Sequence, residues 1–264
     1  MHVISLFMTV DPPIARREVI AARLAEGQSV VAALLATEFA VSEDAIRRDL
    51  RALAAEGRCR RVYGGALPIS PATATMAARL GEGTGKKRLL ARAAAASVGA
   101  GEFLFLDSSS TNLVLVEFLP EDSELTVATN SAAIAAAVAL RQDIRLIVIG
   151  GVVDPVVGGC VDAGAVQAVG LMQFDRTFLG ACSVSAEEGV GAFDFADAAF
   201  KRAAVAAARR TLVLATSDKF DARALHRVAR LDQIDTLVVE AGLDPARYAA
   251  LEAGGCRLLS AAAD

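Results

Sequence analysis

The second part of the chain, from residue 86 onward, alternates short apolar runs with longer stretches of helical periodicity, and this pattern limits the fold more than any other feature. Short runs rich in Val, Leu, Ile and Phe are typical of strands buried on both faces, and their alternation with helices favours an α/β domain on a mostly parallel sheet. Hydrophobic residues make up 54% of the chain, with no Trp, so Ala, Val, Leu and Phe must build the core. The predicted strands are FLFLD (103–107), LTVATN (125–130), IRLIVIGG (144–151), RTFLGACSV (176–184), TLVLATSD (211–218) and TLVVE (236–240).

Polar residues follow several of these predicted strands. In open parallel sheets ligands bind beyond the carboxyl ends of the strands, and the first N–H groups of a helix that starts there can bind an anion. Glycines would leave room for a ligand, and a lysine would supply positive charge. The alternative is that Ser, Thr and Asn at these positions only cap helices. Because four such segments converge on one edge, we predict a site for a phosphate-bearing small molecule. Its predicted residues are Asp107, Ser108, Ser109, Ser110, Thr111, Thr129, Asn130, Gly150, Gly151 and Lys219.

The segment VSEDAIRRDLRALAAEGRCRRVYGGA, residues 41–66, carries a second pattern, which predicts a helix from about Glu43 to Glu56. Ser42 can cap its N-terminus, and Gly57 follows its last turn. The apolar residues that recur at i, i+4 and i+7 on one stripe are Ile46, Leu50 and Leu53. The arginines that project from the remaining surface are Arg47, Arg48 and Arg51. The stripe would dock on a core and leave the arginines free.

A short β-ribbon with a glycine turn is predicted over residues 58–65, in the shape of a wing that contacts the DNA backbone beside a major-groove helix. Between Ile46 and Ala66 six arginines oppose two acidic residues, a local balance of +4 in a chain of net charge −4. An arginine-rich helix alone is often only a solvated face, but this local excess indicates phosphate binding. The residues predicted to contact DNA are Ser42, Arg47, Arg48, Arg51, Arg60, Arg61, Tyr63 and Gly64.

These patterns predict two domains. Residues 1–67 would form a small winged helix-turn-helix, with a first helix near Ile14–Glu26 and a second helix, capped by Ser29, that carries Val31, Leu34 and Leu35 on its apolar face. Residues 68–85, rich in Pro, Gly and Ser, would be a linker with one helix near Thr73–Leu80. Residues 86–264 would form the α/β domain.

Cysteine usage and hydropathy exclude several classes of protein. The four cysteines are scattered without a CxxC pair and there are only two histidines, so we expect reduced, mostly buried thiols and no zinc site. No apolar run approaches the roughly 20 residues that span a bilayer, and the start of the chain lacks the features of a signal peptide. We therefore expect a cytoplasmic protein with no membrane, metal or cofactor partner.

The chain resembles the DeoR family of bacterial transcriptional regulators over nearly its whole length. In the first part the matching residues are Arg17, Ile20, Leu24, Gly27, Leu34, Phe39, VSEDAIRRDL (41–50), Gly57, Arg61 and Gly64–Ala66. In the second part they are DSSST (107–111), Thr129–Ser131, Gly150, Gly151, Asp175, Gly180, Gly189, Lys201 and Lys219. The resemblance implies a winged helix-turn-helix followed by a sensor domain that resembles the ribose-5-phosphate isomerase and CoA transferase-like fold and senses a phosphorylated sugar. It adds Asp175 and Lys201 to the expected effector-binding residues.

The chain departs from the family pattern at three places. Ala45 stands where the family usually has threonine, so a hydroxyl that could contact DNA is missing. Ser109 replaces a glycine and would narrow the phosphate-binding loop. Thr216–Lys219 (TSDK) replaces the usual segment and adds the carboxylate of Asp218 near that loop.

The segment FDFADAAFKRA, residues 193–203, is similar to a segment of family members that respond to glycerol 3-phosphate. The alternative is a helix with Phe195 and Phe200 packed inward and with Lys201 and Arg202 in solvent.

The leading hypothesis for function is a DNA-binding repressor of a carbohydrate or polyol catabolic operon. It would bind a double-stranded DNA operator as a homodimer or homotetramer, and a phosphorylated sugar or polyol effector would release it. The alternative is a sugar-phosphate isomerase-like enzyme with Asp107, Asp175 or Asp197 as general base. No paired-carboxylate spacing singles out one of them, and an enzyme has no need of the arginine-rich segment, so we expect no enzymatic activity. A DNA-architectural protein without a ligand would not explain the polar strand ends.

Overall fold

The computed structural model describes residues 13–25, 28, 30–62, 64–68, 75–220 and 222–262. Contacts divide the chain into two compact units, Met1–Ala74 and Thr75–Asp264, and each has its own hydrophobic core. None of the helices in the described ranges has the length and apolarity that a membrane span requires. All four cysteines are free, and Cys182 is the one among them that is not buried.

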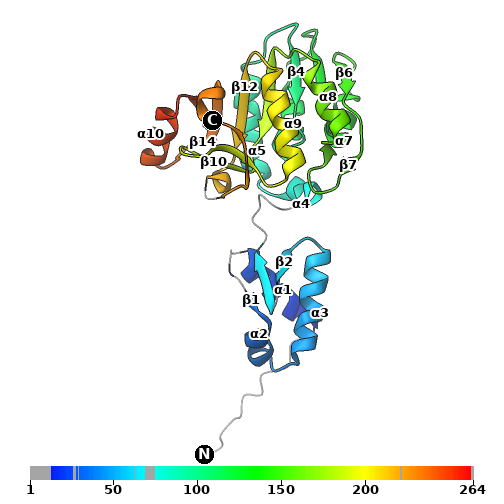
Figure 1. The fold of residues 1–264 in the computed structure, drawn as a ribbon, viewed down its shortest axis with the longest axis vertical. Helices are drawn as coiled ribbons and strands as arrows, with labels where there is room; N and C mark the ends of the chain where they lie inside the picture. The colour runs from blue at the N-terminus through cyan, green and yellow to red at the C-terminus, as the bar shows by residue number, and fades with distance from the viewer. Residues whose placement is uncertain are drawn as a thin grey trace, which may run out of the picture. The chain divides into compact units, whose positions relative to one another are not determined.

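The first unit contains three helices, α1 (Pro13–Ala25), α2 (Ala32–Glu38) and α3 (Glu43–Ala55), and a small antiparallel sheet in the order β1 (Val30–Val31), β3 (Gly65–Pro68), β2 (Cys59–Val62) (Figure 1). The predicted helix with an N-cap at Ser42 is confirmed, because the Ser42 side chain accepts a hydrogen bond from Ala45 N at 3.3 Å. Its predicted apolar stripe, Ile46, Leu50 and Leu53, is buried in the core of the unit.

The prediction for the second helix was wrong at its start. Val30 and Val31 pair with Ala66 and Gly65 of β3, so α2 begins at Ala32 and Val31 precedes it without a side-chain cap. The physical reason is that two β-branched residues beside a glycine-containing strand favour a short strand. Leu34 is 69% exposed, so it does not lie on the buried face of α2. Ser29, the predicted cap, lies outside the described residues.

The second unit is built on a seven-stranded sheet in which all adjacent strands are parallel. Its strands in spatial order are β15 (Arg257–Ala261), β14 (Thr236–Glu240), β12 (Thr211–Ala215), β9 (Arg176–Gly180), β4 (Phe103–Leu106), β5 (Thr126–Thr129) and β6 (Arg145–Val148). The parallel sheet predicted from the alternating pattern is therefore confirmed. The edge strand β15 was not predicted.

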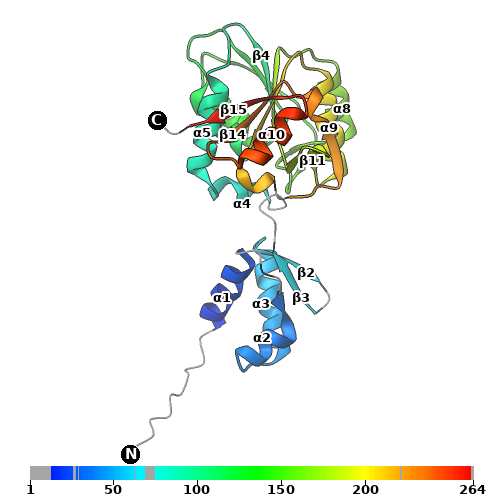
Figure 2. The ribbon, with the colours of Figure 1, turned by 90° about the vertical axis from the view of Figure 1, so that its left-hand side faces the viewer.

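Helices cover both faces of this sheet (Figure 2). The helices that pack on one face are α5 (Thr84–Ala95), α6 (Ser110–Leu115) and α7 (Ala132–Val138), and those on the other are α8 (Ala163–Gly170) and α9 (Phe195–Ala206). Successive residues of β4 pack into different cores, because Leu104 and Leu106 face α5 while Phe105 faces α9. The last helix, α10 (Pro245–Ala253), joins a third core near β14 and β15 through Leu251.

Two small antiparallel sheets extend this unit. One has the order β10 (Ser183–Ser185), β11 (Gly189–Ala192), β13 (His226–Ala229), and the other is the hairpin of β7 (Val153–Asp154) and β8 (Gly159–Cys160). The second unit also includes α4 (Met76–Gly81) and the start of α5, which had been assigned to a linker over residues 68–85. The helix expected near Thr73–Leu80 corresponds to α4, which Thr75 caps by accepting from Ala78 N.

Candidate functional site

The chain order in the large sheet reverses between β4 and β9. From β4 the chain proceeds through β5 to β6 on one side, and from β9 through β12, β14 and β15 on the other. Crevices at the carboxyl ends of the strands flanking such a reversal are the usual ligand sites of open α/β sheets. The turn Asp107–Asn112 lies at this point, directly after β4 and at the start of α6.

A hydrogen-bond network holds this turn against the end of β5. Ser108 N donates to Asn130 Oδ1 at 3.1 Å, and Thr129 Oγ1 donates to Leu106 O at 2.7 Å. Ser109 caps α6, because its hydroxyl accepts from Asn112 N at 3.0 Å. The residues that the structure brings together here, all buried, are Asp107, Ser108, Ser109, Ser110, Thr111, Thr129 and Asn130. The Ser109 hydroxyl caps a helix, which is the alternative role predicted for it, and the Thr129 hydroxyl is used in a bond to β4.

The carboxylate cluster, defined as Asp107, Asp197 and Lys201, lies beneath the end of β9. Lys201 Nζ lies 3.3 Å from Asp107 Oδ2 and 3.1 Å from Asp197 Oδ2, and it donates to Gly180 O at 3.0 Å. Gly180 N donates to Asp107 Oδ2 at 3.1 Å. Side chains of the cluster are at most 5% exposed, so these charges interact with little solvent screening.

Burial raises the pKa of Asp107, an effect that Lys201 opposes and Asp197 reinforces. Burial alone would lower the pKa of Lys201, but the two carboxylates together raise it above its ordinary value. Lys201 therefore stays charged, while burial makes Asp107 easier to protonate than an exposed carboxyl.

The predicted alternative for the FDFADAAFKRA segment was wrong for two of its residues. Lys201 is buried and Phe195 is 66% exposed, where its ring contacts His226 edge-on at 5.5 Å. Asp194 caps α9 by accepting from Asp197 N, and this start places Asp197 and Lys201, four residues apart, on the inward face. Phe200 is buried and Arg202 exposed, as that alternative predicted.

Three cationic side chains from α4, α5 and the segment after β12 are defined as the cationic end: Arg79, Lys87 and Lys219. Arg79 Nη2 donates to Val156 O and Val157 O at 3.1 Å each, and Lys87 Nζ donates to Arg79 O. Helix α4, which carries Arg79, packs against α6. Lys219 follows β12, and its proximity lowers the pKa of Lys87 further than burial alone does.

Among the described residues, only one of the three cations at the cationic end forms an ion pair. Lys219 Nζ pairs with Asp218 Oδ2 at 2.7 Å, so the additional carboxylate of the TSDK segment partly neutralises this lysine. Within the described residues Arg79 and Lys87 form no ion pair, although Glu82 lies near enough to Lys87 to raise its pKa. Arg79 Nε is buried and has no acceptor among these residues. An anion could supply that acceptor.

Two sets of predicted effector residues lie away from this site. Asp175 precedes β9 and lies at the amino edge of the sheet, where its Oδ2 accepts from Phe103 N at 2.9 Å and its Oδ1 lies 3.4 Å from Arg209 Nη1. Asp175 therefore does not lie with the other predicted effector residues at the carboxyl edge of the sheet. Gly151 lies against the carboxylate of Asp162, the N-cap of α8, and Gly150 is exposed.

Sequence reasoning did not place Arg79, Lys87 or Asp197 in the effector site. Arg79 lay in the predicted linker and Lys87 near the start of the predicted α/β domain, and the cationic character of both was the available signal. Asp197 had been considered only as a catalytic base, although its spacing of four residues from Lys201 predicts an ion pair on one helix face. The hairpin of β7 and β8 was also missed, and it covers the site, because Gly159 lies against Ser108 and Asn130 Nδ2 donates to Cys160 O at 3.1 Å.

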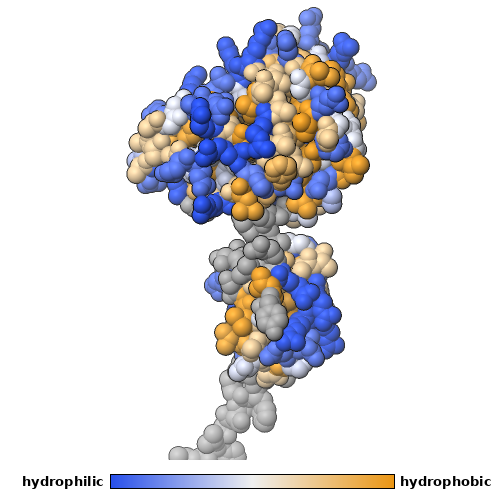
Figure 3. Space-filling model, in the orientation of Figure 1, coloured by the Kyte–Doolittle hydropathy of each residue, from blue (hydrophilic) through white to orange (hydrophobic). Residues whose placement is uncertain are grey.

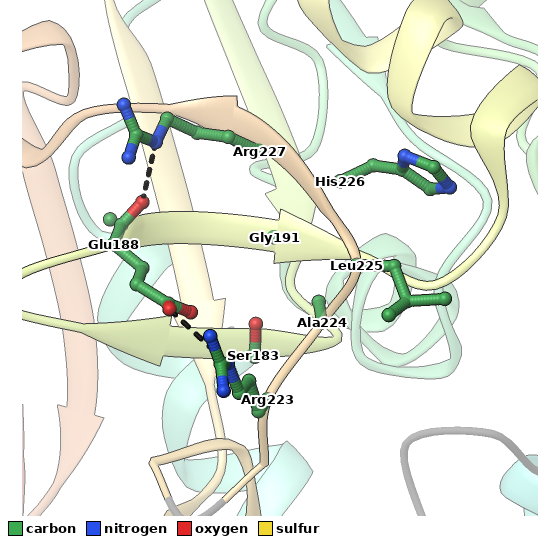
Figure 4. A pocket seen from close by; sticks show the side chains of 9 residues that line it. Ser183, Glu188, Gly191, Arg223, Ala224, Leu225, His226 and Arg227 are labelled. Atoms are coloured by element: carbon green, nitrogen blue, oxygen red, sulfur yellow. Dashed lines mark hydrogen bonds and ion pairs between the residues drawn. The ribbon is translucent and has the colours of Figure 1, made fainter.

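A separate hollow of about 350 Å³ lies on the small sheet of β10, β11 and β13 (Figure 4). Its cationic groups are bound within the protein, because Arg223 Nε lies 3.3 Å from Glu188 Oε1 and Arg227 Nε donates to Glu188 O at 3.1 Å. No residue predicted to bind the effector lines this hollow. We therefore do not place the effector site there.

In the first unit, the exposed face of α3 carries Arg47, Arg48 and Arg51, and Figure 3 shows a continuous hydrophilic surface over this helix. Arg47 Nη2 lies 2.8 Å from Glu43 Oε2, while Arg48 Nε and Arg51 Nε each donate to a backbone carbonyl of α3 at 3.3 Å. Such exposed pairs contribute only about 0.3–0.5 kcal/mol, so phosphate can replace them readily.

The predicted wing is present as β2 and β3, which pair antiparallel with Val62 opposite Gly65. Gly64 has φ +81, a left-handed conformation that favours glycine in the tight turn between the strands. Arg61 is exposed on β2. Tyr63 and the side chain of Arg60 lie outside the described residues. Arg58, in contrast, binds Glu18 through two hydrogen bonds of 2.8 and 3.0 Å and so ties the wing to α1.

The first unit has an arginine-bearing helix beside a wing, and the second is an α/β unit with a polar site at the switch point of its sheet. Together these features define a DNA-binding regulator with a sensor domain. A model of the DeoR-like helix-turn-helix domain matches residues 16–72, and a model of the DeoR C terminal sensor domain matches residues 82–241. The chain belongs to the DeoR family of transcriptional regulators.

Relatives along most of the chain are regulators as well. The chain is 30% identical to the HTH-type transcriptional regulator YulB of Bacillus subtilis strain 168, over 81% of this chain and 83% of that protein. It is 27% identical to the glycerol-3-phosphate regulon repressor of Escherichia coli K12, over 78% of this chain and 82% of that protein. These relatives and the family models make the chain a transcriptional regulator and not an isomerase.

Among solved structures, the chain is similar to ribose 5-phosphate isomerase A from Neisseria gonorrhoeae, with 16% identity and a TM-score of 0.38 over 52% of this chain and 53% of that protein.

Proposed function

We propose that this chain is a repressor that binds operator DNA through α3 and the wing and is released by a phosphorylated sugar or polyol bound at the carboxyl edge of the sheet. The observation that carries the effector class is the cationic end, where Arg79 of α4, a helix that packs against α6, has a buried N–H without an acceptor among the described residues. The glycerol-3-phosphate regulon repressor among the relatives supports a carbohydrate or polyol operon as the target. Operator binding would place the protein in the bacterial cytoplasm.

The DNA contacts proposed for the first unit divide by function. Arg47, Arg48 and Arg51 would enter the major groove from α3, while Arg60 and Arg61 would bind backbone phosphates from the wing. Ser42, Tyr63 and Gly64 would contact the backbone at the helix start and the wing turn. Phosphate contacts provide affinity for any sequence, and base contacts provide preference for one.

Replacing Arg48 and Arg51 together with alanine is expected to weaken operator binding at least tenfold, because two exposed charges no longer reach the DNA. Each lost phosphate contact should also reduce the slope of log affinity against log salt by about 1. Gel shifts over a salt series measure both quantities. Arg209→Ala removes an equally exposed arginine from the second unit and serves as the matched control. Equal affinity of the double variant and the control would contradict the assignment of α3.

The effector phosphate is proposed to bind between the start of α6 and the cationic end. Ser110 and Thr111 open that helix, and their hydroxyl groups can donate to a phosphate. Unpaired phosphate is costly to bury, so Arg79, Lys87 and Lys219 would neutralise it.

Lys219→Ala is expected to raise the effector concentration needed for operator release at least tenfold. The substitution removes one cation and also leaves Asp218 without its partner beside the phosphate. Ser110→Ala should act in the same direction through loss of a hydroxyl donor. Lys86→Ala is the control, because Lys86 is already bound to Glu240 and Ser217. Release curves for all three variants against glycerol 3-phosphate and fructose 6-phosphate test the assignment, which unchanged curves for the first two would refute.

The path from the effector site to the DNA-binding unit is proposed to pass through the hairpin of β7 and β8. Gly159 of this hairpin contacts Ser108, and on its other side Met76 N donates to Val156 O at 3.1 Å. Met76 starts α4, the first helix after the segment that joins the two units. A ligand that displaces the hairpin would therefore change the packing of α4, the kind of two-state element through which one site biases another.

We further propose that the protein binds its operator as a homodimer or homotetramer. One winged helix offers few base contacts, while two half-sites multiply the discrimination, and symmetric dimers are the commonest oligomers. Light scattering at micromolar concentration is expected to give at least twice the monomer mass. A monomer both with and without DNA would contradict this proposal.

A further inference from the structure

The carboxylate cluster and its neighbours contain buried polar atoms that lack partners among the described residues. They are Asp107 Oδ1, Ser108 Oγ, Asn112 Oδ1 and Asp197 Oδ1. The residues that carry them are at most 4% exposed, so solvent does not supply partners freely. All four atoms can accept a hydrogen bond, and three of them can only accept when the carboxylates are ionised.

None of the described residues donates a hydrogen bond to these atoms. Lys201 directs its ammonium to Asp107 Oδ2, Asp197 Oδ2 and Gly180 O, which accounts for its three protons. The Asn112 amide nitrogen donates to Asp107 O at 3.0 Å and to Phe178 O at 2.8 Å. Buried acceptors of this kind are costly unless a ligand or bound water pairs with them.

The cationic end shows the opposite chemistry. Arg79 Nε there is a buried donor without an acceptor, and Arg79 and Lys87 have no ion-pair partner in the described part of the chain. A phosphate has acceptors and negative charge, so it matches the cationic end and not the carboxylate cluster. A hydroxyl group has a donor, so it matches the cluster.

We propose that the carboxylate cluster is the part of the effector site that binds hydroxyl groups, and that its excess negative charge restricts effectors to polyhydroxy compounds with a single anionic group. This inference rests on the proposed function, since it assumes that the phosphate binds at the cationic end. It goes further by assigning specificity to Asp107 and Asp197. Two carboxylates and one ammonium leave a net charge of −1, which disfavours a second phosphate or a carboxylate at the distal end of the ligand.

A ligand reaches Ser108, which lies next to the cluster in the chain, only when the hairpin of β7 and β8 moves. A side-chain carbon at Gly159 would lie 2.7 Å from Ser108 Cβ, so no space for a ligand remains above Ser108 in this structure. The same movement would release Asn130 Nδ2 from Cys160 O. Hydroxyl binding at the cluster and displacement of the hairpin are therefore linked.

The test compares ligands that share a phosphate and differ at the other end. Titration calorimetry on the full chain would use glycerol 3-phosphate, n-propyl phosphate, 3-phosphoglycerate, fructose 6-phosphate and fructose 1,6-bisphosphate. Binding is expected to be at least about tenfold tighter for glycerol 3-phosphate than for n-propyl phosphate, which lacks its two hydroxyls, because missing hydroxyls leave buried acceptors unpaired. The second anionic group should weaken binding at least tenfold for 3-phosphoglycerate relative to glycerol 3-phosphate. The same reduction is expected for fructose 1,6-bisphosphate relative to fructose 6-phosphate.

Asp197→Asn provides the matched variant, since it keeps the size of the side chain and removes one negative charge. It is expected to reduce the discrimination against 3-phosphoglycerate and fructose 1,6-bisphosphate at least tenfold. Asp218→Asn is the control at the cationic end, where loss of a negative charge should strengthen binding of all these phosphates alike and leave their ratios unchanged.

The outcomes separate the inference from the proposed function. If none of the five phosphates binds, both the phosphate site and the inference are wrong. If they bind with equal affinity, or if Asp197→Asn leaves every ratio unchanged, the phosphate site stands and the role of the carboxylate cluster is refuted. Preference for hydroxyls that Asp197→Asn alters in the expected direction supports the inference.

Discussion

Asp49→Ala is expected to unfold the DNA-binding unit and abolish operator binding while the sensor unit stays folded. Arg16 of α1 and Asp49 of α3 form a buried ion pair, with Asp49 Oδ2 2.7 Å from Arg16 Nε and 2.6 Å from Arg16 Nη2. The two side chains are 7% and 9% exposed. Removing one partner of a buried pair leaves an uncompensated charge and costs about 3–5 kcal/mol. A unit of this size holds only about that much stability in its core.

The measurement is a denaturant titration of the full chain followed by circular dichroism, together with gel shifts. We expect the transition of the first unit to be lost and that of the second to be retained. The control is the double variant Arg16→Met with Asp49→Leu, because replacing a buried ion pair with apolar residues of similar volume is often neutral or stabilising. Wild-type operator affinity in Asp49→Ala would show that the pair does not hold α1 on α3.

Sequence reasoning predicted well those features that depend on residues close together in the chain. Helix α3 has its cap at Ser42 and its stripe at Ile46, Leu50 and Leu53 within one short segment, and all of these residues act as predicted. The central strands are equally local, because short continuous apolar runs rich in β-branched residues are typical of strands buried on both faces. In contrast, the edge strand β15 (RLLSA) includes the exposed residues Arg257 and Ser260 and so lacks a continuous apolar run.

The effector site was predicted only in part, because its charges come from segments far apart in the sequence. Asp107 and Lys201 meet through the pairing of β4 with β9 and the packing of α9, which no local pattern reports. Lys201 was therefore known only through the family resemblance, and its burial was not expected. The position of Asp175 could have been predicted from the local sequence. It precedes the apolar run of β9 and so must lie at the amino edge of a parallel sheet.

Lys201→Met is expected to destabilise the sensor unit by about 3–5 kcal/mol at neutral pH, because it leaves two buried carboxylates without a cation. Asp107 is fully buried and the Asp197 side chain is 5% exposed. With Lys201 present, burial already raises the pKa of Asp107 above its ordinary value. Without it, the folded state must either hold two adjacent charges or take up protons.

This reasoning fixes the sign of the pH dependence. A carboxyl whose pKa is raised by folding binds more protons in the folded than in the unfolded state, so its destabilising effect is absent below the unfolded pKa of about 4. The effect grows as the pH rises from there through the raised folded pKa. Lys201→Met should therefore lose less stability at pH 5 than at pH 7.5, measured by denaturant unfolding against wild type.

The variant Lys201→Met with Asp107→Asn and Asp197→Asn is the control for this pH dependence, since it has no titrating group in the cluster. The stability that this variant loses relative to wild type should be the same at pH 5 and at pH 7.5, while its side chains keep a similar volume. A constant stability deficit of Lys201→Met across this range would show that its cost comes from lost packing of the lysine chain. In that case the carboxylates would already be neutral in the folded protein, and the net charge that limits the effector to one anionic group would be absent.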